Sequence, residues 1–69
     1  MIKIKLSSLL GAKRMPQAEL ARKTGIRPNT INAMYHEYTK YINKDDIDKI
    51  CEVLNCDVSD LLEYVPNKE

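Results

Sequence analysis

The chain has 69 residues, of which 43% are hydrophobic and 30% charged, so it can form one small domain of ordinary globular composition. It contains neither Phe nor Trp, and a core of aliphatic side chains is typical of small helical bundles. The net charge of +1 conceals an asymmetry, because residues 1–40 hold eight lysines and arginines against two acidic residues, whereas residues 41–69 hold three against eight. This separation indicates a polyanionic partner, with the accidental segregation of solvated helix faces as the alternative.

The beginning of the chain, MIKIKLSSLLGAKR, has lysines followed by apolar residues, as a signal peptide does. Its apolar stretch is short and interrupted by two serines, and no convincing cleavage site follows. No apolar run approaches the length of a membrane span. We therefore expect a soluble, cytoplasmic protein with no membrane partner.

Three helices are predicted in the first part of the chain. Residues 2–6 alternate between apolar and basic, as in a short strand, but Leu6, Leu9 and Leu10 recur at helical spacing. We expect a helix from about residue 5 to residue 13, and the residues before it could be extended. A second helix should begin after Pro16 and end at Gly25, and a third should begin at Pro28, since proline suits the first position of a helix and glycine its end.

The second part of the chain predicts two more helices. Asn43 is placed as the cap of a fourth helix, whose inner face would be formed by Ile47, Ile50, Cys51 and Leu54. Asp57 could cap a short fifth helix carrying Val58, Leu61 and Leu62, and residues 66–69 should be a frayed tail. The fold class predicted is therefore all-α: a compact bundle of five helices in one domain, residues 1–65.

The sequence offers little for catalysis or cofactor binding. Cys51 and Cys56 are expected to be small buried apolar residues rather than a disulfide, and together with His36 they are too few for a metal site. His36 is expected to be an exposed or capping residue without a chemical role. Because no catalytic triad, carboxylate pair or glycine-rich phosphate loop is present, we expect no enzyme, no metal and no cofactor.

Residues 17–36 fit the mechanical requirements of a helix-turn-helix. Two helices that cross at a wide angle with almost no loop need a small residue at their contact, a glycine in the turn and apolar residues facing inward. Ala21, Gly25, Ile26 and Ile31 meet these requirements, and Leu20 and Met34 would complete the core. The segment QAELARKTGIRPNTINAM resembles the helix-turn-helix of the Cro and phage-repressor family, also called the xenobiotic response element (XRE) family. DIDKICEVLNCDVSDLLEYVP is similar to its fourth and fifth helices.

The resemblance implies a five-helix, lambda-repressor-like domain that binds operator DNA in the major groove, usually as a homodimer. The third helix would then reach base edges while the second rests across the phosphate backbone. Candidates for base reading are Asn29, whose carboxamide can pair with adenine, and then Thr30 and Asn32, with an ordinary solvated role as the alternative for each. Candidates for contacts to the DNA backbone are Gln17, Arg14, Arg22, Lys23, Arg27 and Lys40.

The sequence departs from the family at Pro28 and Ala33, where relatives often carry longer polar side chains, and in the loop after the third helix. Tyr38 and Tyr41 of that loop could contact DNA or cover the core. Double-stranded DNA is the expected partner of a transcriptional regulator and repressor. The alternative is a protein-binding module, an antitoxin or anti-repressor, that uses the acidic second part of the chain. Candidates for a homodimer interface are Leu61, Leu62, Tyr64 and Val65, although the leucines could instead complete the core.

Overall fold

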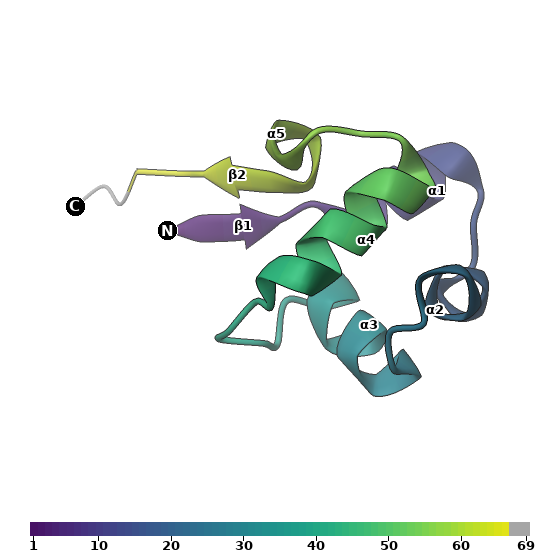
Figure 1. The fold of residues 1–69 in the computed structure, drawn as a ribbon. Coiled ribbons are helices and arrows are strands. Elements are labelled where there is room, and N and C mark those ends of the chain that lie inside the picture. Colours follow the sequence, from purple (N-terminus) through teal and green to yellow (C-terminus); the bar gives the residue numbers. More distant parts are fainter. Residues whose placement is uncertain (67–69) are drawn as a thin grey trace.

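The computed structural model describes residues 1–66, which form five helices and a two-stranded sheet (Figure 1). In chain order the elements are β1 (Ile2–Ile4), α1 (Leu6–Lys13), α2 (Gln17–Thr24), α3 (Pro28–Tyr35), α4 (Lys44–Leu54), α5 (Val58–Leu61) and β2 (Leu62–Tyr64). All five predicted helices are present, and the fold class is confirmed. Residues 67–69, which form most of the predicted tail, lie outside the described residues.

The helix boundaries follow from local chemistry. Pro28 is the first residue of α3, where its missing N–H costs nothing, and Gly25 ends α2 in the left-handed conformation at φ 76°. Asn43 caps α4 as predicted, since its Oδ1 accepts a hydrogen bond from the amide of Asp45 at 2.8 Å. At α5 the carboxylate of Asp60 accepts from the amide of Asp57 at 3.0 Å, as part of a capping box.

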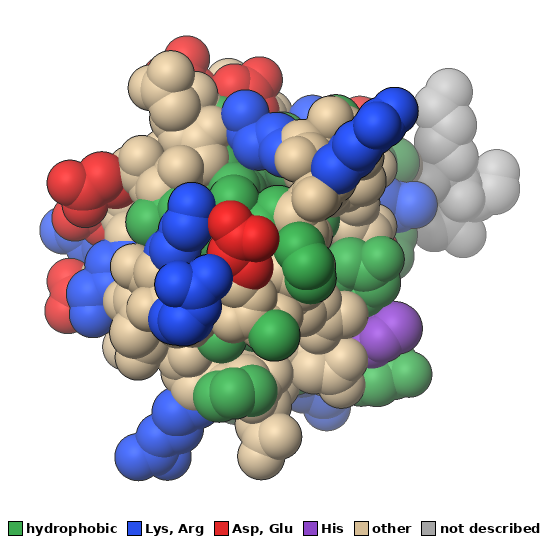
Figure 2. Space-filling model, turned by 90° about the vertical axis from the view of Figure 1, so that its right-hand side faces the viewer, with side chains coloured by type: hydrophobic (Ala, Val, Ile, Leu, Met, Phe, Trp, Pro, Cys, Tyr) green, Lys and Arg blue, Asp and Glu red, His purple; other side chains and the backbone are tan. Residues whose placement is uncertain are grey.

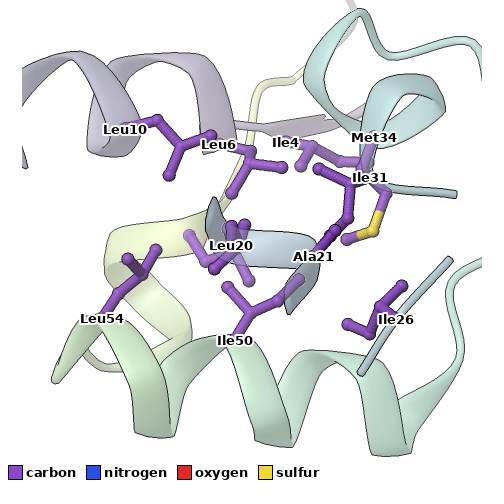
Figure 3. Packing of buried hydrophobic residues seen from close by; sticks show 11 residues of the cluster. Ile4, Leu6, Leu10, Leu20, Ala21, Ile26, Ile31, Met34, Ile50 and Leu54 are labelled. Atoms are coloured by element: carbon purple, nitrogen blue, oxygen red, sulfur yellow. The ribbon is translucent and has the colours of Figure 1, made fainter. Parts of the chain in front are cut away.

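The core is a single cluster of aliphatic side chains enclosed by the helices. Figure 3 shows Leu20 of α2 in its centre, with Leu6 on one side and Ile50 of α4 on the other. The predicted inward residues of the helix-turn-helix are all buried. Burial of one leucine contributes about 1.5–3 kcal/mol, so Leu20 anchors α2 to the rest of the domain. The buried hydrophobic residues are Ile4, Leu6, Leu10, Leu20, Ala21, Ile26, Ile31, Met34, Ile50, Leu54 and Leu61.

The sheet joins the two ends of the described chain, and β2 was not predicted. The strands are antiparallel, with Ile2 opposite Tyr64 and Ile4 opposite Leu62. The prediction that the fifth helix includes Leu62 is wrong: α5 ends at Leu61, and Leu62 begins β2 because it pairs with the start of the chain. In Figure 1 the sheet projects from the helices, with β1 below β2.

Leu61 is fully buried in the core of the single chain. Its side chain therefore has no surface to offer to a second copy. Leu61 completes the core of its own chain, which was the alternative to a place in a dimer interface. Leu62 is half-buried, Val65 is half-buried and Tyr64 is exposed, so these three remain candidates for a dimer interface.

Both cysteines are free and half-buried. The amide of Cys56 donates to the carbonyl of Cys51 at 3.0 Å, where the chain leaves α4 through Asn55 in the left-handed conformation. Burial, and then the neighbouring thiol of Cys51, raise the pKa of Cys56 above its usual value. A raised pKa suppresses the thiolate and makes Cys56 a poor nucleophile.

Candidate nucleic-acid interface

The turn between α2 and α3 is held by a buried hydroxyl. The Oγ1 of Thr24 donates to the carbonyl of Leu20 at 2.7 Å and accepts from the amide of Ile26 at 3.2 Å. The amide of Gly25 donates to the carbonyl of Ala21 at 2.9 Å. Because these bonds tie the turn to the last residues of α2, the start of α3 has a fixed direction relative to α2.

A small side chain lets the two helices approach each other. Ala21 is 7% exposed and Ile31 is fully buried, and in Figure 3 the two lie next to each other where α2 meets α3. A longer side chain at position 21 would separate the helices, because protein interiors have no spare volume at such contacts. The contact predicted from the sequence is therefore present.

The face of α3 that points away from the core is polar. Successive residues of a helix are about 100° apart, so Asn29, Asn32 and Ala33 share the side opposite buried Ile31 and Met34. Asn29 and Asn32 are exposed. Thr30 is half-buried and therefore less exposed than Asn29 and Asn32. It lies to the side of this face, so it has less room than they have to reach a ligand.

His36 extends this face by a further turn, a role that was not predicted for it. It follows α3 directly, two helical turns after Asn29, and it is exposed. Its ring stacks on that of Tyr38, with centroids 5.4 Å apart, and meets the ring of Tyr35 edge-on at 5.0 Å. Its spacing of seven residues from Asn29, about two helical turns, is the sequence feature that could have placed it on this face. We name Asn29, Asn32, Ala33 and His36 the outer face of α3.

The beginning of α2 borders an open hollow of about 300 Å³ whose lining includes Arg14, Gln17 and Tyr35. The amides of Gln17 and Ala18 lie in the first turn of α2, where no carbonyl of the same helix can accept from them. No side chain caps this end, since the residue before it is Pro16. Free amides, the positive end of the helix dipole and a guanidinium together form a suitable place for a phosphate.

The other basic candidates lie apart from this hollow. Arg22 and Arg27 are exposed and border a second open hollow, of about 530 Å³, on the outside of the turn. Lys23 forms an ion pair with Glu19 at 3.2 Å one helical turn away, which offsets part of its charge. The view in Figure 2 faces the α2 side of the molecule, and its acidic side chains lie mainly along the left and upper edges.

Lys40 is exposed in the loop between α3 and α4, together with two tyrosines. Tyr38 is 74% exposed and Tyr41 87% exposed, so neither covers the core. The Oγ1 of Thr39 donates to the carbonyl of Tyr41 at 2.6 Å and accepts from its amide at 3.3 Å, which gives the loop a defined turn. This loop follows the outer face of α3 directly and presents a cation and aromatic rings beside it.

The comparisons with known proteins agree with this geometry. Residues 5–67 match the Cro/C1-type helix-turn-helix DNA-binding domain. The chain belongs to this family. A solved structure, that of a "putative DNA-binding protein" from Bacteroides fragilis, superposes with a TM-score of 0.81 at 25% identity, covering 91% of this chain and 100% of that one. Comparison with curated proteins gives no significant match.

Membership of this family makes DNA binding the functional class of the domain. This chain is a Cro/C1-type helix-turn-helix DNA-binding domain, and helices α1 to α5 all lie within the matched residues. Within residues 1–66, no group of three or more His, Cys, Asp or Glu side chains could hold a metal ion. In the same range, no helix is long and apolar enough to cross a membrane.

Proposed function

We propose that this Cro/C1-type domain is a sequence-specific transcription regulator that represses by occupying operator DNA in the cytoplasm. The observation that carries the proposal is the polar outer face of α3, held in a fixed direction by the Thr24 hydrogen bonds. The major groove of DNA admits an α-helix such as α3, and the carboxamides of Asn29 and Asn32 can bind base edges there.

The phosphate contacts follow from the same placement. With α3 in the groove, the free amides of α2 and the side chains of Gln17 and Arg14 would meet one phosphate, and Lys40 would meet another beyond the end of α3. Arg22, Lys23 and Arg27 are proposed as secondary contacts. The ion pair with Glu19 makes Lys23 the weakest of them.

A single copy of such a module buries only about 600–1,000 Å² on DNA, which is little for tight and specific binding. We therefore propose that the chain acts as a homodimer. Two copies would read half-sites separated by one helical turn, about 34–36 Å, and the operator would be palindromic.

The test is selection of bound duplexes from a random pool, followed by salt titrations of binding to the enriched duplex. We expect one palindromic motif. The slope of the logarithm of the binding constant against the logarithm of the salt concentration should be smaller by about one unit in Lys40→Ala. Lys49→Ala is the matched control, because Lys49 is exposed on the acidic helix α4 and should leave the slope unchanged. Absence of an enriched motif would contradict a sequence-specific regulator.

A second candidate function, binding of a partner protein, has one observation in its favour. An open hollow of about 430 Å³ beside α4 is lined by apolar Ile47, Cys51 and Val58, by the carboxylates of Asp45 and Asp48, and by one cation, Lys44. Such a surface suits a basic segment of a partner, as in an antitoxin or anti-repressor complex. Val58→Asp should abolish capture of that partner and leave DNA binding unchanged, because Val58 is exposed on α5, outside the helix-turn-helix.

A further inference from the structure

The two cysteines lie on either side of the corner through which the chain passes from α4 to α5 (Figure 1). Cys51 is in the last turn of α4, and Cys56 directly follows Asn55, which has the left-handed conformation at φ 53°. Both thiols are free and half-buried, and the functions proposed above use neither of them as a reactive group. Because the backbone of this corner is well defined, it fixes how the two side chains lie.

The backbone of the corner brings residues 51 and 56 together. The amide of Cys56 donates to the carbonyl of Cys51 at 3.0 Å, and the amide of Asn55 donates to the carbonyl of Glu52 at 3.4 Å. Two such bonds around a left-handed residue form a Schellman motif, in which the side chains at the ends of the outer bond are commonly in contact. With this outer bond, standard bond lengths keep the Cα atoms of Cys51 and Cys56 less than about 7 Å apart. A disulfide spans Cα atoms about 4.4–6.8 Å apart, so the corner has suitable dimensions for one.

The surroundings of the two thiols agree with this backbone geometry. Both cysteine side chains pack against the edge of the same hydrophobic core. Burial is the first cause of the raised pKa of Cys56, and the neighbouring thiol of Cys51 is the second. The reduced protein therefore holds two thiols side by side without a bond between them.

Cys51 is the thiol that an oxidant can reach from solvent. It lines the open hollow beside α4, together with Lys44, Asp45 and Asp48. Two carboxylates against one ammonium group make the hollow negative, which disfavours an anionic oxidant such as glutathione disulfide. A small neutral hydroperoxide meets no such barrier. The chemistry of the hollow thus favours hydrogen peroxide or a similar hydroperoxide as the co-reactant.

We propose that Cys51 and Cys56 are a redox-active pair, which a hydroperoxide converts to an intramolecular disulfide at the α4–α5 corner. The Cys51 thiolate attacks one oxygen of hydrogen peroxide and the O–O bond breaks. Cys51 becomes a sulfenic acid, and the second oxygen leaves as water after it takes up a proton. The Cys56 sulfur then loses its proton and attacks the Cys51 sulfur, so the S–S bond forms while the S–O bond breaks and releases a second water.

The reaction balances, because two thiols are oxidised by two electrons in total and one hydrogen peroxide is reduced to two waters. Cys56 reacts second, with a sulfur that the corner holds beside it. Proximity therefore offsets the small thiolate fraction that follows from its raised pKa. Dithiols that are oxidised and reduced again in this way are the usual form of disulfide in reducing compartments.

The bond should stabilise the domain. The reduced protein already holds residues 51 and 56 together through the 3.0 Å hydrogen bond, so the disulfide restricts mainly the unfolded chain. It also ties the end of α4 to the start of α5, whose Leu61 is fully buried in the core. The chemistry does not depend on DNA, so the inference goes beyond the proposed function and stands or falls separately from it.

The first experiment treats the reduced protein with hydrogen peroxide, labels the remaining thiols with iodoacetamide and measures the intact mass. We expect a monomer that has lost two hydrogens and carries no label on either cysteine, and dithiothreitol should restore both labelled thiols. Cys56→Ser keeps the thiol that reacts first and removes its partner, so it should give sulfenic or sulfinic acid instead. Disulfide-linked dimers, or an over-oxidised Cys51 beside a labelled Cys56 in the unaltered chain, would overturn the proposal.

The second experiment measures whether the fold favours the bond. The disulfide and dithiol forms are equilibrated in dithiothreitol redox buffers, in the folded protein and in enough urea to unfold it. We expect the folded chain to favour the disulfide at least about tenfold more than the unfolded chain, which corresponds to a melting temperature about 5–10 °C higher after oxidation. An equal preference, or a lower melting temperature of the oxidised protein, would overturn the proposal.

The matched control for this equilibrium is the double variant Cys51→Ser, Glu52→Cys. It keeps two thiols on the same corner but moves one of them about 100° around α4, to a position that is exposed. We expect its disulfide to be at least about tenfold less favoured in the folded protein than that of Cys51 and Cys56. Equal constants for the two pairs would show that proximity in sequence, rather than the geometry of the corner, is responsible, and would also overturn the proposal.

Discussion

Replacement of Thr24 by Val tests whether the buried hydroxyl holds the helix-turn-helix together. Thr24 is 8% exposed, and valine has nearly its shape, so the change removes one oxygen and leaves the packing in place. The carbonyl of Leu20 keeps its partner within α2, but the amide of Ile26 loses the acceptor that it has at 3.2 Å. Leaving a buried donor without a partner costs about 1–3 kcal/mol, so Thr24→Val should lower the free energy of unfolding by that amount.

That loss is large for a domain of this size, whose total stability is expected to be about 3–10 kcal/mol. Urea unfolding followed by circular dichroism should show a lower midpoint with an unchanged slope, and the melting temperature should fall by about 4–8 °C for each kcal/mol. Thr24→Ser keeps the hydroxyl and is the matched control, with less than half of the loss. If Thr24→Ser lost as much stability as Thr24→Val, the methyl group rather than the hydrogen bonds would be responsible, and the reasoning would fail.

Three further changes have definite expected outcomes. Gly25→Ala should destabilise the protein by about 1 kcal/mol, because φ is 76° at Gly25 and alanine is strained there. Gly11→Ala should stabilise the protein by about 0.5–1 kcal/mol, because Gly11 lies within α1 and a Cβ there meets nothing within 4 Å. Urea unfolding of both variants measures this difference in sign. Alkylation of Cys56 by iodoacetamide should reach half of its maximal rate at a higher pH than that of a free cysteine, because burial raises the pKa of its thiol; an equal or lower midpoint by mass spectrometry would contradict this. His36→Ala should weaken DNA binding in anisotropy titrations by a few fold while leaving the urea midpoint within about 0.5 kcal/mol, as for an exposed residue; unchanged affinity would remove His36 from the interface.

The helices and the turn could be predicted because their signals are local. Pro28 begins α3, Gly25 ends α2 and Asn43 caps α4, and each acts through neighbours within four residues. The positions of Leu20 and Ile31 in the core followed from helical spacing in the same way. Within such short distances the sequence contains the physical cause of the structure.

The strand β2 could not be predicted from local signals. Leu61 and Leu62 continue the spacing of α5, and the reason that the helix stops lies in residues 2–4, about sixty positions earlier in the chain. Leu61 is the last residue of α5, and the packing of α5 against α1 and α4 places it in the core although the sequence placed it among the candidates for a dimer interface.

The candidate site was predicted in its composition but less well in its geometry. Asn29 and Asn32 are on the outer face of α3 as required, but Thr30 lies to the side because one further residue rotates a side chain by about 100°. His36 was expected to be an exposed or capping residue without a chemical role, and its stacking on Tyr38 depends on the fold of the loop. Which bases these side chains read depends on the DNA itself, which local sequence signals do not describe.

The most direct test of the central claim is a map of the amides that change when a DNA duplex is added to isotopically labelled protein in NMR. If α3 enters the major groove, the largest chemical-shift changes should occur at the outer face of α3 and at the start of α2, including the side-chain amides of Asn29 and Asn32 and the backbone amides of Gln17 and Ala18. The amides of α4 should change little. Shifts concentrated on α4 and α5, with none on the outer face of α3, would contradict the account.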